Sequence, residues 1–417
     1  MKRFLIFLCL LVLGMTGCSA AVPDDTQAQE QAAQVVENLS RAAEEISDGM
    51  VLTETEYAAE AEESGETETG DPDGASAMRA DLAEHAYDYQ QLSKEEQKLY
   101  EIILDGLLRS ASDVPIPETE EDVFEKVFQC VINDHPEIFY VDGYTFIKYT
   151  KGEIVTGNAF SGSYIYDPQE IAQRKEQIEE KVSEILDGVP AAGSEYDKVK
   201  YVYEYLITHT EYVQGAEDNQ NICSVFLGGK SVCQGYAKAA QYLFDRIGIY
   251  SVFVSGRVES GEDHAWNIVR VDGDYYHIDT TWGDASYVAD GPGSGYDGKL
   301  PEINYEYLCV PDRQLFRTHT IGSVVPVPEC NSMTANYYVR EGAYFTEADM
   351  DKAAGLFAKA YEDGTAYVTF KCADSAVYEE MERHLIDQQE VFRYLHTTDG
   401  TVAYTTNEAQ LALSFWL

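Results

Sequence analysis

Positive charge is scarce in this 417-residue sequence. It contains 29 Lys and Arg residues against 74 Asp and Glu residues, which gives a formal net charge of -45 at pH 7. A surface this acidic repels the phosphates of DNA and RNA. We therefore expect no nucleic acid among its partners.

Long hydrophobic runs are also lacking. The apolar run Phe4–Leu13 is too short to span a membrane in the mature protein, and it follows the basic start Met1-Lys2-Arg3, as in a secretory signal. The run leads into Met15-Thr16-Gly17-Cys18, which resembles a bacterial lipoprotein signal. That resemblance implies cleavage before Cys18, lipidation of Cys18, and an extracytoplasmic protein anchored to the cell membrane by its acyl chains. An ordinary secretory signal with an incidental cysteine is the alternative.

Cysteines are few and widely spaced. Six follow Cys18, none of them in a Cys-x-x-Cys pair: Cys130, Cys223, Cys233, Cys309, Cys330 and Cys372. This spacing gives no zinc pattern, and we expect no metal and no cofactor. Export would allow some of these thiols to form disulfides, and the sequence permits several pairings.

Composition divides the chain into five parts. After the signal peptide and its cysteine (1–18), an acidic segment with little apolar content (19–81) predicts an extended, disordered tether. Mixed helical and strand-like patterns then predict an N-terminal α+β module (82–190), a central domain (191–330) and a C-terminal α+β module (331–417). The fold class that we expect is α+β.

The central domain contains a glycine-rich turn that leads to a cysteine. Gly228-Gly229 precedes Cys233, and apolar residues at helical spacing follow as far as Ile247. The pattern predicts that Cys233 lies in the first turn of a helix. Unpaired backbone N–H groups and the helix dipole favour a thiolate there, so Cys233 is a candidate nucleophile.

A hairpin follows this helix. Two strand-like runs, 264–271 and 274–282, flank Asp272-Gly273, a strong hairpin signal. With a two-residue turn, Trp266 lies opposite Asp279, so His264 is diagonal to Asp279 on one face of the sheet. The register therefore predicts a His264–Asp279 pair.

A cysteine at a helix start, with an imidazole oriented by a carboxylate, is suited to thiol attack on a carbonyl carbon. The motifs Cys-Gln-Gly-Tyr-Ala (233–237), His-Ala-Trp-Asn (264–267) and Asp-Thr-Thr-Trp (279–282) resemble the bacterial transglutaminase-like superfamily, relatives of the papain-type thiol enzymes. The resemblance covers roughly residues 198–320, including Arg317-Thr318-His319, which looks like the family's tail segment. It implies a papain-like core, with the nucleophile helix packed on an antiparallel sheet. It also implies Cys233 as nucleophile, His264 as base and Asp279 as the orienting carboxylate.

Several alternatives remain open within this domain. His277 shares the predicted face of His264 and is the rival base. Cys223 is the rival nucleophile, but it precedes a glycine turn instead of opening a helix, and we expect it to be a buried thiol. Tyr212 and Gln234 are candidates for an oxyanion-assisting side chain. Trp266 and Trp282 either shield the site from water or pack on the sheet.

We expect a lipid-anchored thiol enzyme that acts on peptide or protein amides, with a cell-wall peptide or a neighbouring surface protein as the substrate. Among relatives outside eukaryotes, hydrolysis is favoured over transamidation crosslinking. The alternative is a catalytically inactive protein that binds cell-wall peptides or other ligands at the cell surface.

Overall fold

The computed structural model describes residues 72–151, 154–284, 301–396 and 400–417. By its internal contacts the chain divides into two units, Met1–Thr69 and Gly70–Leu417, and the described residues belong to the second. The expected signal peptide, Cys18 and residues 19–71 of the expected tether lie outside the described residues. Among those described, no helix is both long enough and apolar enough to cross a membrane.

Residues 72–81, expected to be extended, are helical and form the first part of α2 (Pro72–His85). Leu82 is buried in the hydrophobic core, and Met78 packs against the same core four residues earlier. Arg79 forms an ion pair with Glu101 at 2.9 Å. Met78 and Leu82 lie one helical turn apart and attach the helix to the core, a contact that the acidic composition of the segment does not reveal.

The N-terminal segment (residues 82–190) combines helices with a three-stranded antiparallel sheet in the order β1-β3-β2. After α2, its elements are α3 (Tyr87–Gln91), α4 (Lys94–Leu108), β1 (Val114–Ile116), α5 (Glu121–Asp134), β2 (Val141–Lys151), β3 (Ile154–Tyr164) and α6 (Pro168–Leu186). Helix α4 begins with a capping box, in which Ser93 and Glu96 each bond the other's backbone N–H.

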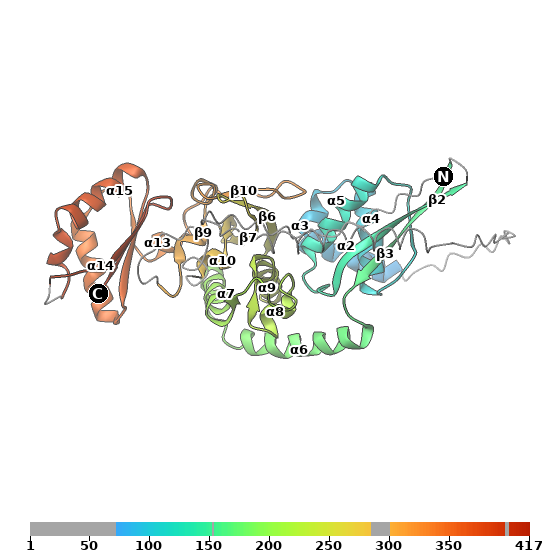
Figure 1. Ribbon diagram of the computed structural model, residues 1–417, viewed down its shortest axis with the longest axis horizontal. Coiled ribbons are helices and arrows are strands. Elements are labelled where there is room, and N and C mark those ends of the chain that lie inside the picture. The colour runs from blue at the N-terminus through green and yellow to red at the C-terminus, as the bar shows by residue number, and fades with distance from the viewer. Residues whose placement is uncertain (1–71, 152–153, 285–300, 397–399) are drawn as a thin grey trace, which may run out of the picture. The chain divides into compact units, whose positions relative to one another are not determined.

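The central segment (residues 191–330) is built on a five-stranded antiparallel sheet in the order β10-β6-β7-β8-β9. Its strands are β6 (Ser251–Val258), β7 (Asp263–Val271), β8 (Asp274–Ile278), β9 (Leu308–Val310) and β10 (His319–Ile321). The helices include α7 (Glu195–His209), α8 (Ile222–Phe226), α9 (Cys233–Arg246), α10 (Thr280–Gly283) and α12 (Asp312–Leu315). Helix α9 packs on β7 and β6 (Figure 1), which confirms the expected α+β arrangement of a helix on an antiparallel sheet.

One hydrophobic core joins the N-terminal and central segments. It contains buried residues of α4, α5, α7, α9 and strands β7 and β8 in a single cluster. The other face of the β6-β7-β8 sheet has a separate cluster that includes Trp266, Ile268 and Tyr307. The sheet is thus covered on both faces, and its side chains alternate between two apolar layers.

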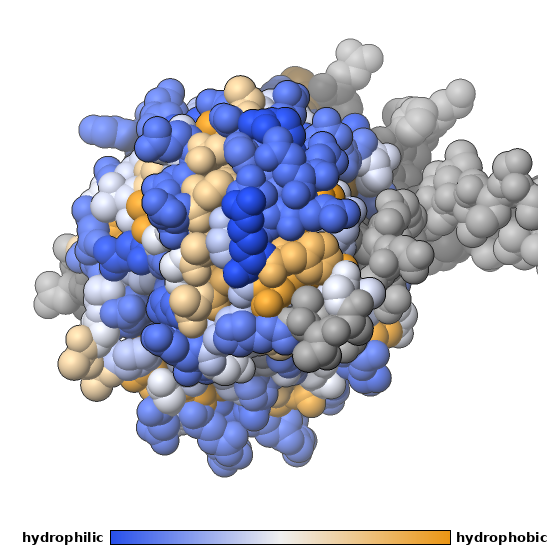
Figure 2. Space-filling view, turned by 90° about the vertical axis from the view of Figure 1, so that its left-hand side faces the viewer, coloured by the Kyte–Doolittle hydropathy of each residue, from blue (hydrophilic) through white to orange (hydrophobic). Residues whose placement is uncertain are grey.

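The C-terminal segment (residues 331–417) has its own core and a four-stranded sheet in the order β11-β12-β14-β13. Its elements are α13 (Tyr337–Arg340), β11 (Tyr344–Phe345), α14 (Met350–Asp363), β12 (Tyr367–Cys372), α15 (Ser375–Glu382), β13 (Tyr404–Asn407) and β14 (Ala412–Trp416). Figure 2 shows a face of the molecule on which hydrophilic residues separate the hydrophobic ones into short stretches.

Candidate active site

Cys233 is the first residue of α9 and is half-buried. Val232 before it is extended, with φ of -118° and ψ of 179°, and provides no side-chain cap for the helix. The first N–H groups of α9 therefore have no capping side chain, and they lie beside the thiol. This is the position that the sequence predicted for Cys233.

Gly235, two residues after Cys233, provides space beneath the turn. Ser231 and Ser224 form a 2.7 Å hydrogen bond there between their hydroxyl oxygens. A Cβ atom at Gly235 would lie 2.0 Å from Ser231 Oγ and 2.9 Å from the carbonyl oxygen of Asn219. The glycine is therefore required by close packing behind the nucleophile.

The β7–β8 hairpin has the predicted register. Asp272 and Gly273 form its turn with φ values of 52° and 91°, and Val271 pairs with Asp274. The pairing continues to Asn267 opposite Ile278, one step before Trp266 and Asp279. The predicted second strand is too long, because β8 ends at Ile278 and Asp279 becomes the N-cap of α10.

Both oxygens of Asp279 are occupied. Oδ1 accepts hydrogen bonds from the N–H groups of Thr281 and Trp282, at 2.9 and 3.0 Å. Oδ2 lies 2.7 Å from His264 Nε2 and 3.1 Å from His319 Nε2. Burial alone would raise the pKa of Asp279, but the two histidines hold it well below its ordinary value, so the carboxylate is ionised.

His264 is also buried, and its side chain is 2% exposed. Burial lowers the pKa of the imidazole, but the charge and hydrogen bond of Asp279, together with the neighbouring Cys233 thiol, raise it to about 10. Because Nε2 is bonded to Asp279, Nδ1 is the nitrogen that remains for the thiol. An imidazolium held between a carboxylate and a thiol stabilises the thiolate form of that thiol.

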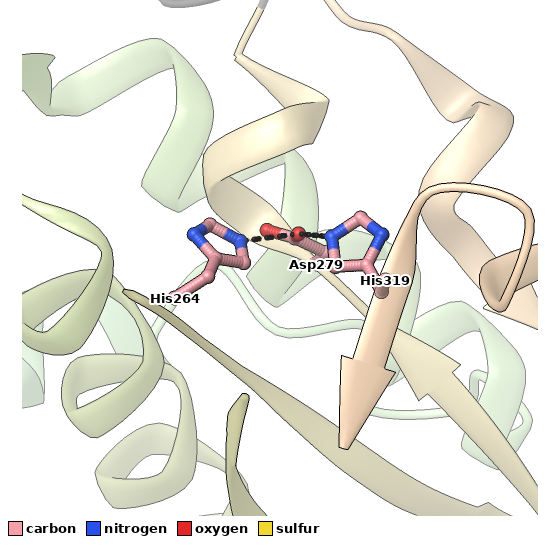
Figure 3. A group of neighbouring side chains, drawn as sticks. All are labelled: His264, Asp279 and His319. Atoms are coloured by element: carbon pink, nitrogen blue, oxygen red, sulfur yellow. Dashed lines mark hydrogen bonds and ion pairs between the residues drawn. The ribbon is translucent and has the colours of Figure 1, made fainter. Parts of the chain in front are cut away.

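His319, the second histidine on Asp279, was not predicted as a site residue. Figure 3 shows the imidazoles of His264 and His319 directed at the same carboxylate. His319 is the first residue of β10, the strand at the edge of the sheet. It pairs with Val258 of β6. Only its place in the segment Arg317-Thr318-His319, which resembles the family's tail, marked it in the sequence.

Aromatic rings enclose this group. The Trp266 ring stacks on His264 with centroids 6.0 Å apart, and the Trp282 ring meets His264 edge-on at 6.2 Å. Both tryptophans also contact the His319 ring. The two roles left open for these residues therefore coincide, because the rings that pack on the sheet also exclude water from the His264–Asp279 pair.

His277, the rival base, binds a different carboxylate. Its Nε2 lies 2.8 Å from Oδ1 of Asp312, and its Nδ1 accepts a 3.1 Å hydrogen bond from Trp266 Nε1. The side chain has no exposed surface. His277 thus belongs to a buried pair of its own, and the Trp266 ring contacts both His277 and His264.

Cys223, the rival nucleophile, does lie in the first turn of a helix, contrary to our expectation. It is the second residue of α8, and its N–H donates to Oδ1 of the cap residue Asn221 at 2.8 Å. The thiol is nevertheless buried, as expected, and burial raises its pKa to about 12. A thiol in this state is a poor nucleophile at neutral pH.

Two groups of described residues have side chains of the types that bind metal ions: His264 with Asp279 and His319, and His277 with Asp312 and Cys330. In the second group, Trp266 donates to His277 Nδ1, so the ring hydrogen is on Nε2 and points at Asp312. A metal would need the lone pair of that Nε2. In the first group the nitrogens that face the carboxylate are already its hydrogen-bond donors. The expectation of no metal stays a prediction.

Part of the chain is similar to known proteins. Residues 183–280 match the model of the transglutaminase-like superfamily. Kyphoscoliosis peptidase is 29% identical in Mus musculus and 27% identical in Homo sapiens, each over 125 residues that cover 26% of this chain. The match spans only 18% of the length of those curated relatives.

Among solved structures, a TGase is 17% identical with a TM-score of 0.25, and the match covers 39% of this chain and 47% of that one. The superfamily match contains Cys233, His264 and Asp279, together with α7, α9 and the β7–β8 hairpin. The chain therefore carries a domain of the transglutaminase-like superfamily.

Proposed function

We propose that this protein is a thiol enzyme that transfers acyl groups from peptide or protein amides, with Cys233 as nucleophile, His264 as acid and base, and Asp279 as the orienting carboxylate. The observation that carries the proposal is the buried 2.7 Å contact between His264 Nε2 and Asp279 Oδ2, with the Cys233 thiol close enough to the same imidazole to raise its pKa. The superfamily match supports a cysteine-type enzyme in general.

In the acylation step, the Cys233 thiolate attacks the carbonyl carbon of the amide and the carbonyl oxygen becomes an oxyanion. Backbone N–H groups in the first turn of α9 are placed to stabilise that oxyanion. His264 Nδ1–H then gives its proton to the leaving amine as the C–N bond breaks, which leaves a thioester on Cys233. Asp279 keeps the hydrogen on His264 Nε2 throughout, so that Nδ1 is the nitrogen that exchanges the proton.

In the second step, water or an amine attacks the thioester, and His264 Nδ1 takes the proton of the attacking group. The C–S bond breaks, the thiolate is restored, and the product is an acid or a new amide. Both outcomes use the same residues, so the access of water or of an amine to the thioester decides between them. We favour water, hence a peptidase or amidase.

We further propose that the enzyme works outside the cytoplasm, anchored to the membrane by a lipid on Cys18. The support is the sequence of residues 1–18 alone. A peptide of the cell wall or a neighbouring surface protein is then the substrate within reach. Labelling cells with an azide-bearing fatty acid tests the anchor, since the label should be absent when Cys18 is replaced by serine.

The enzymatic proposal is tested on residues 70–417 with peptide libraries, with and without a primary amine. Mass spectrometry distinguishes products that have gained water from products that have gained the amine. Cys233→Ala should abolish both, whereas Cys223→Ala, which removes a buried thiol, should retain turnover if the protein folds. Iodoacetamide should label Cys233 faster than a free cysteine at neutral pH, and equal rates would contradict thiol activation.

A further inference from the structure

A row of buried polar side chains links the C-terminal segment to Asp279. Lys371 Nζ donates to Gln410 Oε1 at 3.0 Å, and Gln410 Nε2 lies 3.4 Å from Thr318 Oγ1. Thr318 Oγ1 lies 2.8 Å from His319 Nδ1, and His319 Nε2 lies 3.1 Å from Asp279 Oδ2. All five residues are buried. Lys371 and Gln410 belong to the C-terminal segment, whereas the other three belong to the central one.

The direction of these hydrogen bonds follows from the two ends of the row. Burial lowers the pKa of Lys371, the carboxyl of Glu306 opposes this effect, and Lys371 Nζ donates to Gln410 Oε1. Gln410 must then direct its oxygen to Lys371 and its NH₂ group to Thr318. At the other end Asp279 is ionised and can only accept, so His319 Nε2 carries a hydrogen.

Thr318 and His319 complete the row. Burial lowers the pKa of His319, and the charge of His264 adds to this effect, so His319 is neutral and its Nδ1 is an acceptor. Thr318 accepts from Gln410 and has one hydrogen to donate. His319 Nδ1 lies 2.8 Å from Thr318 Oγ1 and the carbonyl oxygen of Leu315 lies 3.4 Å from it, so the hydrogen goes to the nearer acceptor, His319 Nδ1. Every hydrogen in the row therefore points toward Asp279, and bonds aligned in this way polarise one another.

The charged and titratable groups that face His319 are few among the described residues. Asp279 and His264 interact with it electrostatically, and the Tyr307 ring lies 5.7 Å from its own. Trp266 and Trp282 supply the remaining ring contacts. No cation in the described part of the chain other than His264 competes with His319 for Asp279 Oδ2.

A second set of hydrogen bonds holds the turn of the C-terminal segment that contains Gln410. Gln410 lies between β13 and β14, and its N–H donates to Asn407 Oδ1 at 3.0 Å. Asn407 Nδ2 donates to Glu306 at 2.7 Å, and the carbonyl oxygen of the next residue, Tyr307, accepts from the N–H of Asp279 at 3.1 Å. The turn that contains Gln410 is thus linked by hydrogen bonds to the segment that binds the backbone N–H of Asp279, as well as to the Asp279 side chain.

We propose that the C-terminal segment positions the active site, with Gln410 holding, through Thr318, the neutral form of His319 that accepts at Nδ1 and donates a hydrogen bond to Asp279 from Nε2. His319 and His264 share one oxygen, so the hydrogen bond from neutral His319 draws negative charge away from His264 and moderates the basicity of its imidazole. His319 is a positioning residue, since it acts on the reaction only through Asp279. This proposal rests on the proposed function for its catalytic meaning, but the hydrogen-bond row is testable without turnover.

The test uses ¹⁵N spectra of histidine side chains, which report the tautomer and charge of each ring. In the wild-type protein His319 should be neutral with its hydrogen on Nε2. Gln410→Glu keeps the shape but can no longer donate to Thr318. The Thr318 hydrogen then turns to the introduced carboxylate, and Nδ1 of His319 must acquire a hydrogen of its own. His319 should become an imidazolium, and the titration midpoint of His264 should fall.

His319→Ala should shift the titration midpoint of His264 in the opposite direction to Gln410→Glu. Without His319, the charge of Asp279 acts on His264 alone, and the titration midpoint of His264 should rise by roughly one pH unit. His319→Gln, which can place an N–H near the position of Nε2, should remain close to the wild type. An unchanged His264 midpoint in folded His319→Ala would overturn the proposal, as would a neutral, Nε2-protonated His319 in Gln410→Glu.

Two further variants guard against misfolding and nonspecific effects. Thr318→Val retains shape but removes the hydroxyl that donates to His319 Nδ1. Asp279 still keeps the hydrogen on Nε2, so the ¹⁵N signal of Nδ1 should move toward that of a nitrogen that accepts no hydrogen bond; an unchanged Nδ1 signal would overturn the proposal. Gln389→Glu makes the same chemical change as Gln410→Glu at an exposed position of the C-terminal segment and should leave both histidines unchanged. If Cys233→Ala fails to reduce turnover, the proposed function fails, while the spectra still decide on the row of hydrogen bonds.

Discussion

His264 Nε2 lies 2.7 Å from Asp279 Oδ2, and neither side chain is more than 2% exposed. The carboxylate reaches this position because Asp279 directly follows the last residue of β8 and is the N-cap of α10. The cap fixes Oδ1 on two backbone N–H groups and leaves Oδ2 for the imidazole. The position of the proposed orienting carboxylate is therefore set by local backbone structure.

Asp279→Asn should remove catalysis without moving the backbone. The amide oxygen would remain on the two N–H groups of α10, so its NH₂ group would face His264 Nε2. Nε2 would have to accept, which places the ring hydrogen on Nδ1, the nitrogen that faces the thiol. We expect turnover to fall by on the order of 10³- to 10⁴-fold, measured as kcat/KM. A loss below tenfold would show that Asp279 does not set the tautomer.

The free energy of unfolding should depend on His264 at alkaline pH. The folded protein raises the pKa of His264 from the ordinary 6.5 to about 10, so its stabilising contribution is complete below 6.5 and is lost as the pH rises through 10. Each pH unit in that window costs at most about 1.4 kcal/mol. Urea unfolding of the wild type and of His264→Gln should converge as the pH rises. The quantity to follow is the difference in unfolding free energy between the two proteins, because Asp88, Asp245 and Lys238 titrate in the same range in both.

His277→Ala should separate the two candidate bases. Trp266 and Asp312 would each lose a hydrogen-bond partner, and we expect a stability loss of about 1–3 kcal/mol by urea unfolding. Labelling of Cys233 by iodoacetamide at neutral pH should persist, since His277 contacts neither Cys233 nor Asp279 among the described interactions. His264→Ala should show the reverse, with loss of rapid labelling. Loss of labelling in folded His277→Ala would assign the base role to His277.

Gly235→Ala should displace the nucleophile. The added methyl group would overlap Ser231 Oγ and press on the carbonyl oxygen of Asn219, directly before the turn that carries Cys233. We expect a lower melting temperature and slower labelling of Cys233. Gly355→Ala in helix α14 is the matched control, because a Cβ there meets nothing within 4 Å. It should stabilise the protein by up to about 1 kcal/mol. Equal effects of the two substitutions would contradict the close packing at Gly235.

The local parts of the site were predictable, and the nonlocal ones were not. The turn Asp272-Gly273 fixes the hairpin register, and from it the diagonal of His264 and Asp279 follows by counting. His319 is 40 residues from Asp279 and reaches it only because β10 pairs with β6, and no residue pattern encodes that pairing. Gln410 is farther still, 92 residues from Thr318.

Errors at element boundaries have physical causes as well. The sequence 274–282 is strand-like throughout, but the carboxylate of Asp279 satisfies two N–H groups and so starts a helix turn. Cys223 precedes a glycine pair, yet the Asn221 side chain caps a short helix before those glycines. In both cases the hydrogen bonds of one capping side chain favour a helix start over the extended or turn conformation. Hydrophobic periodicity does not reveal this local competition.

Lys238 connects the nucleophile helix to the N-terminal segment. Its ammonium donates to the carbonyl oxygens of Ile132 and Asn133 at the end of α5, and it lies 4.2 Å from the centroid of the Phe253 ring. A truncation at residue 191 would deprive this buried cation of both acceptors and would uncover the apolar surface shared with α4 and α5. The superfamily domain consequently depends on its contacts with the N-terminal segment. An exchange of this domain with that of a homologue would have to include the N-terminal segment from α2 onward.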